Sequence, residues 1–351
     1  MNKQNPIRVG IAGFGLSGKI FHAPFLSADP RYTLSRVYER TSERAREEYP
    51  DIAIVRSFQE LLTDGIDLVV ITTPNQLHVP MAREALAAGK HVVVEKPAAA
   101  SSAEVEELRR LAEERHVLFS VYQNRRLDGD FLTVKRLIEE GRLGEVVDYE
   151  CRLDRFIQGP RDKQWKRDGG QGVDLLYDIG VHIIDQAVAL FGMPEEVYAD
   201  LRRQRPESSG VDRFTVTLHY PGMRAVLSAG ELVAMPSLHF IVNGRKASFI
   251  KYGRDVQEAR LERGLRPAGD PAWGRDDPET YGTLYTVTES GVAEEKIPTE
   301  IGNYGAYYDQ LYRAIRNGEP PAVKPEEAAS VLRILEAAQA SSRERRRISL
   351  A

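Results

Sequence analysis

Three residues of this chain carry side chains suited to moving a proton to and from a hydroxyl group, namely Lys96, Asp178 and His182. Lys96 directly follows an apolar run, His91–Glu95, that is typical of a buried strand, where packing alone does not explain an ammonium group. A neighbouring positive charge would lower the pKa of this lysine and suit it to proton transfer, and its ammonium could also donate a hydrogen bond to a substrate hydroxyl. A surface ion pair with Glu95 is the other interpretation.

A second group of titratable residues lies on one expected helix. Asp178, His182 and Asp185 are spaced four and three residues apart, so on a helix they share one face. Asp178 or Asp185 could orient the imidazole and stabilise its cation, which leaves His182 as a base near neutral pH. The alternatives are a buried, hydrogen-bonded structural histidine, and a metal site with His78 as a further ligand. Because the metal site would need another ligand from a distant part of the chain, we expect no metal.

A glycine-rich turn follows the first expected strand, Ile7–Ala12. Gly13 permits a tight turn, Gly15 lets the backbone approach a phosphate without a Cβ in the way, and Gly18 lets the next helix pack closely on the strand. The N-terminus of that helix supplies unpaired N–H groups and partial positive charge for an anion. We therefore expect this turn to bind the pyrophosphate of a dinucleotide, the alternative being an ordinary glycine-rich turn. The turn consists of Gly13, Phe14, Gly15, Leu16, Ser17 and Gly18.

Residues after the second and fourth expected strands are candidates for contacts with the rest of the cofactor. Glu39 follows the strand Tyr32–Tyr38, where its carboxylate would accept hydrogen bonds from ribose hydroxyls and repel a 2′-phosphate, which favours NAD. Arg40 could still reach a 2′-phosphate, so NADP stays open. A polar loop after the fourth strand would face the ribose or the nicotinamide, unless it is an ordinary turn whose Asn75 caps the next helix. The loop residues concerned are Thr72, Thr73, Pro74, Asn75 and His78.

These candidates lie at the ends of short strands that alternate with helices in the first third of the chain. Helical patterns at Gln76–Ala88 and Ser101–Arg115 separate strongly apolar strands, as in a parallel sheet covered on both faces. We expect a doubly wound Rossmann domain over residues 1–124, with the ligand crevice at the carboxyl ends of its strands. The expected strands are Ile7–Ala12, Tyr32–Tyr38, Ile52–Val55, Ile66–Thr72, His91–Glu95 and Val117–Tyr122.

The rest of the chain, residues 125–351, consists mainly of strands that follow one another. This order favours an α/β domain with an open, mainly antiparallel sheet. Residues 173–190 predict the helix that carries Asp178 and His182, and residues 253–279 predict an irregular excursion. The other expected helices are Phe131–Glu140, Tyr304–Arg316 and Pro325–Ser341, and the expected strands are Val146–Phe156, Glu196–Gln204, Arg213–Tyr220, Arg224–Glu231, Leu238–Val242 and Ala247–Lys251.

Composition limits the partners of the chain. Charged residues make up 28% of its 351 residues and the formal net charge is −4, so no basic excess attracts nucleic acid or anionic lipid. The single cysteine, Cys151, excludes an internal disulfide and fits a reducing compartment. The first residues lack the apolar stretch of a signal peptide, and no run approaches the length of a membrane span. We expect a cytoplasmic protein without nucleic-acid or membrane partners.

Together these motifs resemble the glucose-fructose oxidoreductase / inositol dehydrogenase family, often called Gfo/Idh/MocA, over essentially the whole chain. The matching motifs are the glycine-rich turn, Thr73-Pro74-Asn75 with His78, Glu95-Lys96-Pro97, and Tyr177-Asp178 with His182. Several stretches look like the branch of scyllo-inositol dehydrogenases, namely residues 15–24, 120–126, 130–133, 154–156 and 248–253. One departure is Gln123, which stands where this branch often has His.

The resemblance implies the fold, the assembly and the roles of particular residues. It implies that Lys96, Asp178 and His182 form a catalytic set that also contacts the substrate, and it assigns Glu95 and Asn124 to the cofactor site. The open sheet of the second domain often forms an oligomer interface in this family, so we expect a homo-oligomer, a dimer or a tetramer. Further candidates for substrate contacts are Asp154, Arg155 and Trp165.

The expected activity is the NAD(P)-dependent oxidation of a secondary alcohol of a cyclic polyol or sugar. The best single guess is scyllo-inositol to scyllo-inosose, or the reverse reduction. His182 would remove the hydroxyl proton, Lys96 would bind the same oxygen, and Asp178 would orient the substrate or His182. The alternatives are a glycoside hydrolase that keeps NAD bound and a non-catalytic dinucleotide sensor. A sensor needs no proton relay, so the intact set of three residues argues against it.

Overall fold

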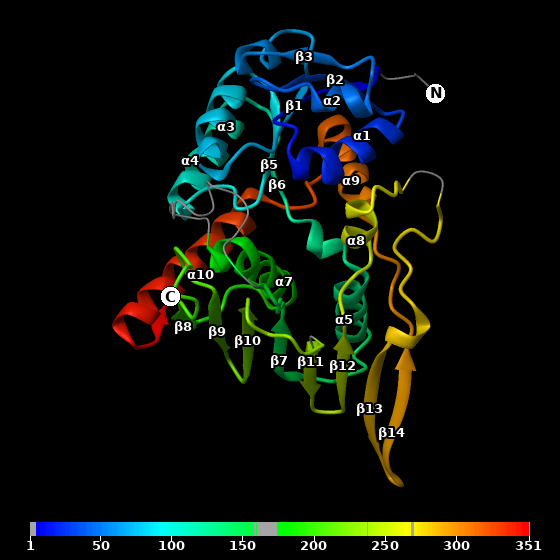
Figure 1. Ribbon diagram of the computed structural model, residues 1–351. Helices are drawn as coiled ribbons and strands as arrows, with labels where there is room; N and C mark the ends of the chain where they lie inside the picture. Colours follow the sequence, from blue (N-terminus) through cyan, green and yellow to red (C-terminus); the bar gives the residue numbers. More distant parts are fainter. Residues whose placement is uncertain (1–4, 158, 160–173, 237, 268–269, 351) are drawn as a thin grey trace. The chain divides into compact units, whose positions relative to one another are not determined.

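The computed structural model in Figure 1 describes residues 5–157, 159, 174–236, 238–267 and 270–350. Contacts divide the chain into two compact units. The first segment of the first unit ends at Gln123, and two later segments also belong to this unit. The first unit comprises Met1–Gln123, Gln257–Pro271 and Tyr304–Ala329, and the second comprises Asn124–Val256, Ala272–Asn303 and Ser330–Ala351.

The first unit is built on a six-stranded sheet with the strand order β3-β2-β1-β4-β5-β6. All of its described strand pairs are parallel. Every residue of β4 is buried, as expected for a strand covered by helices on both faces. The doubly wound parallel sheet expected from the sequence is therefore confirmed. The strands are β1 (Ile7–Ala12), β2 (Tyr32–Tyr38), β3 (Ala53–Val55), β4 (Leu68–Ile71), β5 (His91–Glu95) and β6 (Phe119–Tyr122).

Helices lie on both faces of this sheet, with α3 and α4 on one side and α1 and α2 on the other (Figure 1). Helix α4 begins at a capping box, in which the Ser101 side chain accepts the N–H of Glu104 and the Glu104 carboxylate accepts the N–H of Ser101. Gly89 follows α3 with a φ of 72°, a conformation that glycine adopts without a steric penalty. The helices are α1 (Ala23–Ala28), α2 (Arg44–Glu48), α3 (His78–Ala87), α4 (Ser102–Glu114), α8 (Gln257–Glu262) and α9 (Gly305–Asn317).

The carboxyl ends of the strands place the expected cofactor residues along one edge of the sheet. Strand β1 leads into Gly13, β2 into Glu39, β4 into Thr72, and β5 into Lys96. Strands β1 and β4 are neighbours in the sheet although they are not consecutive in the chain. Ligands of doubly wound sheets bind at such a switch point, outside the carboxyl ends of the strands.

The second unit is built on a nine-stranded sheet with the order β14-β13-β12-β11-β7-β10-β9-β8-β15. Strands β7 and β10 pair in parallel, and the other described pairs are antiparallel. Buried and partly exposed residues alternate along β9, so one face of the sheet packs on the core. The strands are β7 (Val146–Arg152), β8 (Glu196–Arg202), β9 (Arg213–Tyr220), β10 (Met223–Gly230), β11 (Leu238–Gly244), β12 (Ala247–Tyr252), β13 (Gly282–Thr288), β14 (Gly291–Ile297) and β15 (Ile348–Ser349).

Helix α7 (Val181–Phe191) lies against the buried face of this sheet. Its Phe191 ring lies 5.3 Å from the Tyr149 ring of β7, and its Gln186 contacts Cys151 at 3.9 Å. The sequence predicts one continuous helix over residues 173–190, but a π-helical turn, η5 (Leu176–Gly180), precedes α7. The other helices that contribute to this unit are α5 (Gly129–Glu139) and α10 (Pro325–Glu344), and helix α8 lies in the segment that the sequence predicts to be irregular.

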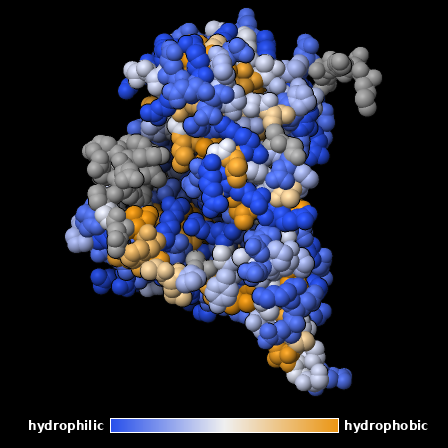
Figure 2. Space-filling model, turned by 45° about the vertical axis from the view of Figure 1, so that its right-hand side comes forward, coloured by the Kyte–Doolittle hydropathy of each residue, from blue (hydrophilic) through white to orange (hydrophobic). Residues whose placement is uncertain are grey.

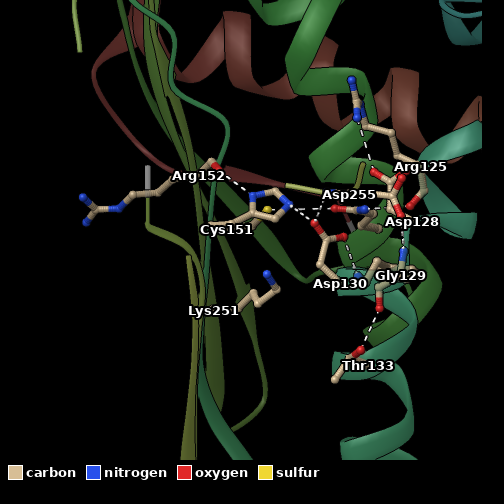
Figure 3. Close-up of polar contacts among 12 residues, drawn as sticks. Arg125, Asp128, Gly129, Asp130, Thr133, Cys151, Arg152, Lys251 and Asp255 are labelled. Carbon is tan, nitrogen blue, oxygen red and sulfur yellow. Dashed lines mark hydrogen bonds and ion pairs between the residues drawn. The ribbon is translucent and has the colours of Figure 1, made fainter. Parts of the chain in front are cut away.

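A cluster of buried charged side chains lies between α5 and the sheet of the second unit (Figure 3). Asp130 Oδ2 accepts the N–H of Asp255 at 2.9 Å, and the Asp255 carboxylate accepts the N–H of Gly129 at 2.8 Å. His239 donates from Nδ1 to the Arg152 carbonyl at 2.7 Å, while its Nε2 lies 3.5 Å from Asp130. Burial raises the pKa of Asp130 to about 7 and lowers the pKa of His239 to about 3. Burial therefore favours the uncharged forms of both Asp130 and His239.

The face of the molecule drawn in Figure 2 is mainly hydrophilic, with hydrophobic side chains exposed in small areas. Four large hydrophobic residues of the second sheet are more than two-fifths exposed, and they are Tyr198, Tyr252, Val287 and Val292. Among the residues that the structure describes, no helix has both the length and the apolar composition needed to cross a membrane.

Candidate functional site

The glycine-rich turn of the first unit is held by β4. Gly13 has a φ of 94°, a value that favours glycine, and its N–H donates to the Tyr38 carbonyl at 3.0 Å. The Thr72 hydroxyl donates to the Gly13 carbonyl at 2.8 Å. Phe14 is buried, whereas Leu16 is 51% exposed. The turn is thus fixed by neighbouring strands on both sides of β1.

Two glycines of this turn have opposite surroundings. A Cβ on Gly18 would lie 2.7 Å from the Gly13 carbonyl oxygen and 3.0 Å from the Thr72 hydroxyl, so a larger residue does not fit there. A Cβ on Gly15 would have no described atom within 4 Å. The space beside Gly15 is therefore open on the side where a phosphate group would approach the backbone, and the turn fits the pyrophosphate of a dinucleotide.

Ser17 and Glu95 join this turn to the end of β5. The Ser17 hydroxyl donates to the Glu95 carboxylate, and His22 Nε2 lies 2.9 Å from the same oxygen, Glu95 Oε1. Glu95 Oε2 accepts the backbone N–H of Lys96 at 3.1 Å. Glu95 is 8% exposed, so the interpretation of Glu95 and Lys96 as a surface ion pair does not describe this carboxylate.

His78 joins the polar loop after β4 to the segment after Lys96. Its Nδ1 lies 2.8 Å from the Pro97 carbonyl and its Nε2 lies 2.9 Å from the Thr73 carbonyl. Burial lowers the pKa of His78, although both carbonyl oxygens favour its protonated form. Since both ring nitrogens face carbonyl oxygens, this histidine holds two loops together. No group of three or more metal-ligating side chains occurs among the described residues.

The Glu39 carboxylate accepts hydrogen bonds from residues that follow it closely in the sequence. Oε1 accepts the Ser42 hydroxyl at 2.6 Å and the Arg44 N–H at 3.2 Å, and Oε2 accepts the Ala45 N–H at 2.9 Å. The carboxylate therefore holds the N-terminal turn of α2, where a negative charge is also favoured by the helix dipole. Glu39 is 5% exposed, whereas the next residue, Arg40, is exposed.

The remaining cofactor candidates lie in short helical turns. Pro74 and Asn75 stand at the start of η3 (Asn75–Leu77), directly after the polar loop. Asn124 is buried and begins η4 (Asn124–Leu127), the first element of the second unit.

The second unit carries the aspartate and histidine candidates. Asp178 lies within η5, and its carboxylate is 4.0 Å from the guanidinium of Arg155. His182 lies on the first turn of α7 and is 4% exposed. Asp185 forms a bidentate pair with Arg126, with both N–O distances 2.7 Å. The two carboxylates thus each face an arginine, and the negative charge of Asp185 serves to hold Arg126.

The other substrate candidates differ in their surroundings. Asp154 lies 3.4 Å from Arg213, and burial raises its pKa although this arginine lowers it. Trp165 lies outside the described residues. The hydroxyl of Tyr177, next to Asp178, is buried and has no hydrogen-bond partner among the described residues. Burial raises the pKa of Tyr177 to about 12.

Sequence reasoning missed several polar residues that these contacts bring into the site regions. His22 was not singled out, although a histidine four residues after Gly18 in an apolar segment is a usable signal. Arg126 could not be paired with Asp185, since 59 residues separate them. Tyr308, which contacts His22, is separated from it by 286 residues.

Comparisons with known proteins agree with this architecture. The family model described as "Oxidoreductase family, NAD-binding Rossmann fold" matches residues 7–123, and the model of its C-terminal alpha/beta domain matches residues 135–350. The scyllo-inositol 2-dehydrogenase (NADP(+)) IolW of Bacillus subtilis is 42% identical over 99% of this chain and 97% of its own length. The oxidoreductase YdgJ of Escherichia coli is 40% identical over 98% of this chain and 99% of its own length.

Solved structures show the same fold over the whole chain. The structure of the oxidoreductase yvaA from Bacillus subtilis matches with a TM-score of 0.96 and 41% identity, and covers 100% of both chains. The YPO2259 oxidoreductase from Yersinia pestis matches with a TM-score of 0.92 and 38% identity, over 99% of this chain and 98% of the other. The chain therefore belongs to the Gfo/Idh/MocA oxidoreductase family and is a nicotinamide-dependent dehydrogenase.

Proposed function

We propose that this protein oxidises a secondary alcohol of a cyclic polyol or sugar, and that scyllo-inositol, oxidised to scyllo-inosose, is the best single substrate; the same site would run the reverse reduction. The observation that carries the proposal is the Glu95 carboxylate, which accepts hydrogen bonds from both the dinucleotide turn and the backbone of Lys96. This contact ties the backbone of Lys96 to the same carboxylate as the turn. The relative IolW, named for its action on scyllo-inositol, supports the choice of substrate.

The bound dinucleotide supplies the acceptor of the hydride from the carbinol carbon. We assign the proton to His182, which removes it from the substrate hydroxyl. Lys96 donates a hydrogen bond to the same oxygen and stabilises the charge that develops there as the proton leaves. Asp178, paired with Arg155, orients the substrate or His182. Asp154 and Arg155 are the candidates for contacts with the other hydroxyl groups of the polyol.

Cofactor choice is the second part of the proposal. The sequence suggests a preference for NAD because Glu39 would repel a 2′-phosphate. Since three donors of its own chain already engage the Glu39 carboxylate, we propose that NADP is also accepted and that the exposed Arg40 binds its 2′-phosphate. Arg40→Ser is expected to weaken NADP binding about 10- to 100-fold and to leave NAD binding unchanged. Equal losses for the two dinucleotides in a fluorescence titration would contradict this role, and Arg83→Ser on α3 serves as the control.

The third part of the proposal concerns the partners of this protein, which we infer from its family. We propose a small-molecule polyol as substrate and a homo-oligomer that uses the open face of the second sheet, where Tyr198 and Tyr252 are exposed. Sedimentation or light scattering would determine the oligomeric state, and a monomer at micromolar concentration would contradict this proposal.

The activity is tested by a screen of inositol isomers and aldoses with NAD and NADP, followed at the absorbance band of the reduced nicotinamide. We expect reduction of the dinucleotide with scyllo-inositol and weaker reduction with other cyclic polyols. Release of a sugar from a glycoside without net reduction would identify a hydrolase instead. Binding of a dinucleotide without turnover of any polyol or sugar would identify a sensor.

A further inference from the structure

A continuous chain of hydrogen bonds runs through the interior of the first unit, from the dinucleotide turn to α9. The Ser17 hydroxyl donates to Glu95 Oε1, and His22 Nε2 lies 2.9 Å from that oxygen. His22 Nδ1 lies 2.8 Å from the hydroxyl of Tyr308 on α9. Because Glu95 Oε2 also accepts the Lys96 N–H, the Glu95 carboxylate is the junction between the turn, the lysine and the histidine.

Because Glu95 is buried, its carboxylate depends on hydrogen-bond donors for its stabilisation. His22 is fully buried and Glu95 is 8% exposed. Burial opposes ionisation of Glu95, but the hydrogen bonds from His22 and Ser17 outweigh it, so the pKa of Glu95 is lowered. A carboxylate only accepts hydrogen bonds, so the His22 Nε2 that faces it carries a hydrogen. Removing that donor would leave a buried carboxylate with part of its stabilisation lost.

The orientation of His22 is set by the local backbone and by two tyrosines. His22 ends η1 (Gly18–His22), a π-helical turn directly after the glycine-rich turn. The Tyr122 hydroxyl donates to the Phe21 carbonyl at 3.1 Å, and the Tyr308 hydroxyl lies 3.0 Å from the same carbonyl oxygen. The His22 ring also lies against the Tyr122 ring, with the ring centroids 4.4 Å apart. A wider helical turn of this kind is frequent at functional sites, and here it directs an imidazole at Glu95.

We propose that His22 and Glu95 are positioning residues that hold the dinucleotide turn and Lys96 in one fixed arrangement. This inference rests on the proposed function, which assigns the turn to the cofactor and Lys96 to the substrate oxygen. Through Ser17 the pair sets the turn that binds pyrophosphate, and through the Lys96 N–H it sets the backbone from which the lysine side chain extends. One substitution at His22 therefore weakens dinucleotide binding and slows turnover together.

The test compares four variants that keep Glu95 and Lys96. His22→Leu removes the donor, His22→Gln keeps an N–H that can donate, and Tyr308→Phe removes the hydroxyl that contacts the imidazole. Tyr32→Phe is the matched control, since its buried hydroxyl donates to the Tyr308 carbonyl at 2.7 Å and contacts neither His22 nor Glu95 in a described hydrogen bond. The measurements are the melting temperature, the dissociation constants of NADH and NADPH by fluorescence without any polyol, and then kcat and KM.

We expect His22→Leu to raise the dinucleotide dissociation constant about 10-fold or more and to lower kcat by a larger factor, with little change in KM for the polyol. His22→Gln should recover most of both losses, which a loss of packing alone would not predict. Tyr308→Phe should weaken dinucleotide binding more than Tyr32→Phe does. The control should bind the dinucleotide as the wild type does, even where its melting temperature falls.

A folded His22→Leu variant with wild-type dinucleotide affinity and turnover would overturn the inference. If His22→Leu fails to fold, the inference is tested with the two tyrosine variants instead. Equal dinucleotide affinities in Tyr308→Phe and Tyr32→Phe would then overturn the inference. If the wild-type protein binds the dinucleotide but oxidises no polyol, only the proposed function is refuted. The dinucleotide dissociation constants of the variants then still test the positioning role of His22. A wild-type protein that binds no dinucleotide refutes both.

Discussion

The dinucleotide turn of the first unit and the Asp178–His182 segment of the second both adjoin a π-helical turn, yet they hold their polar groups differently. In the first unit the partners are backbone groups and buried side chains, such as Thr72 on the Gly13 carbonyl and His22 on Glu95. In the second unit the carboxylates of Asp178 and Asp185 face the guanidinium groups of arginines. The first region is thus a rigid cradle of the kind that suits one invariant ligand.

The second region holds paired charges on long side chains. Arg155 lies in the segment after β7 and Arg213 begins β9, and both keep about a third of their side-chain surface exposed. Arginine and carboxylate groups together can donate to and accept from the many hydroxyls of a polyol. With the function proposed above, the first region would determine which cofactor binds and the second would determine which substrate binds.

The strongest way to break this comparison is to remove one reacting group from each unit. Lys96→Ala and His182→Ala are each expected to lower kcat about 10²- to 10⁴-fold, because each removes a group that assists the proton transfer. Both variants should still bind the dinucleotide. Steady-state kinetics with fluorescence titration checks this, and turnover like the wild type in either variant would remove that residue from the mechanism.

A second test distinguishes the roles of Asp178 and Asp185 by replacing each of them with asparagine. Asp185→Asn should lower the free energy of unfolding by about 3 kcal/mol, because it removes the carboxylate that pairs in a bidentate manner with the largely buried Arg126. The Asp178 carboxylate faces Arg155, which is more exposed than Arg126. Asp178→Asn should therefore change the free energy of unfolding little and mainly lower kcat. Chemical denaturation and kinetics measure the two effects, and the reverse assignment would show that Asp185 is the functional carboxylate.

The packing of the dinucleotide turn is tested by substituting alanine at Gly15 and at Gly18. Gly18→Ala should destabilise the protein by about 1–3 kcal/mol, since its Cβ would lie 2.7 Å from the Gly13 carbonyl. Gly15→Ala should keep the stability of the wild type and weaken dinucleotide binding, because its Cβ enters the open space beside the turn. Unchanged dinucleotide affinity in Gly15→Ala would place the pyrophosphate elsewhere.

The smallest expected effect concerns Asp130, a buried carboxyl group of the second unit. The pKa of Asp130 rises from 3.8 to about 7 on folding, chiefly through burial, so the folded state binds a proton that the unfolded state has lost between these values. Stability from this group is therefore present at low pH and decreases as pH rises from about 4 to about 7. Asp130→Asn should remove this decrease and leave the opposite contribution of His239, whose pKa is lowered, so the melting temperature of the variant should rise by a few degrees relative to the wild type as pH increases from about 4 to about 7. An unchanged slope would show that Asp130 ionises normally.

The six-stranded sheet of the first unit was largely predictable from the sequence because its determinants are local. Strands β1, β2 and β5 have the predicted bounds, and each is followed directly by a glycine or a charged residue. The glycine-rich turn and the segment with Lys96 are contiguous motifs at the ends of such runs, and the sheet order places them at one edge.

The parts that could not be predicted depend on residues far apart in the chain or on strands without an apolar pattern. Strand β14 is exposed along nearly its whole length, so it carries no alternation of buried and exposed residues that would identify it. The position of the Glu39 carboxylate depends on three donors, the Ser42 hydroxyl and the first two N–H groups of α2, and the sequence does not give the conformation of the connection that brings them to it. Helix α8 was hidden in a segment rich in charges and glycine.

The discontinuity of the first unit has a practical consequence for anyone who cuts or recombines this enzyme. Tyr307 and Tyr308 are buried in the first unit, where their hydroxyls reach Ser120 and the Phe21 carbonyl, although they stand nearly two hundred residues after β6. A fragment that stops at residue 124 lacks these aromatic rings and exposes the apolar surface they cover. A chimera intended to carry this dinucleotide specificity onto another scaffold must therefore take α9 along with the amino-terminal segment.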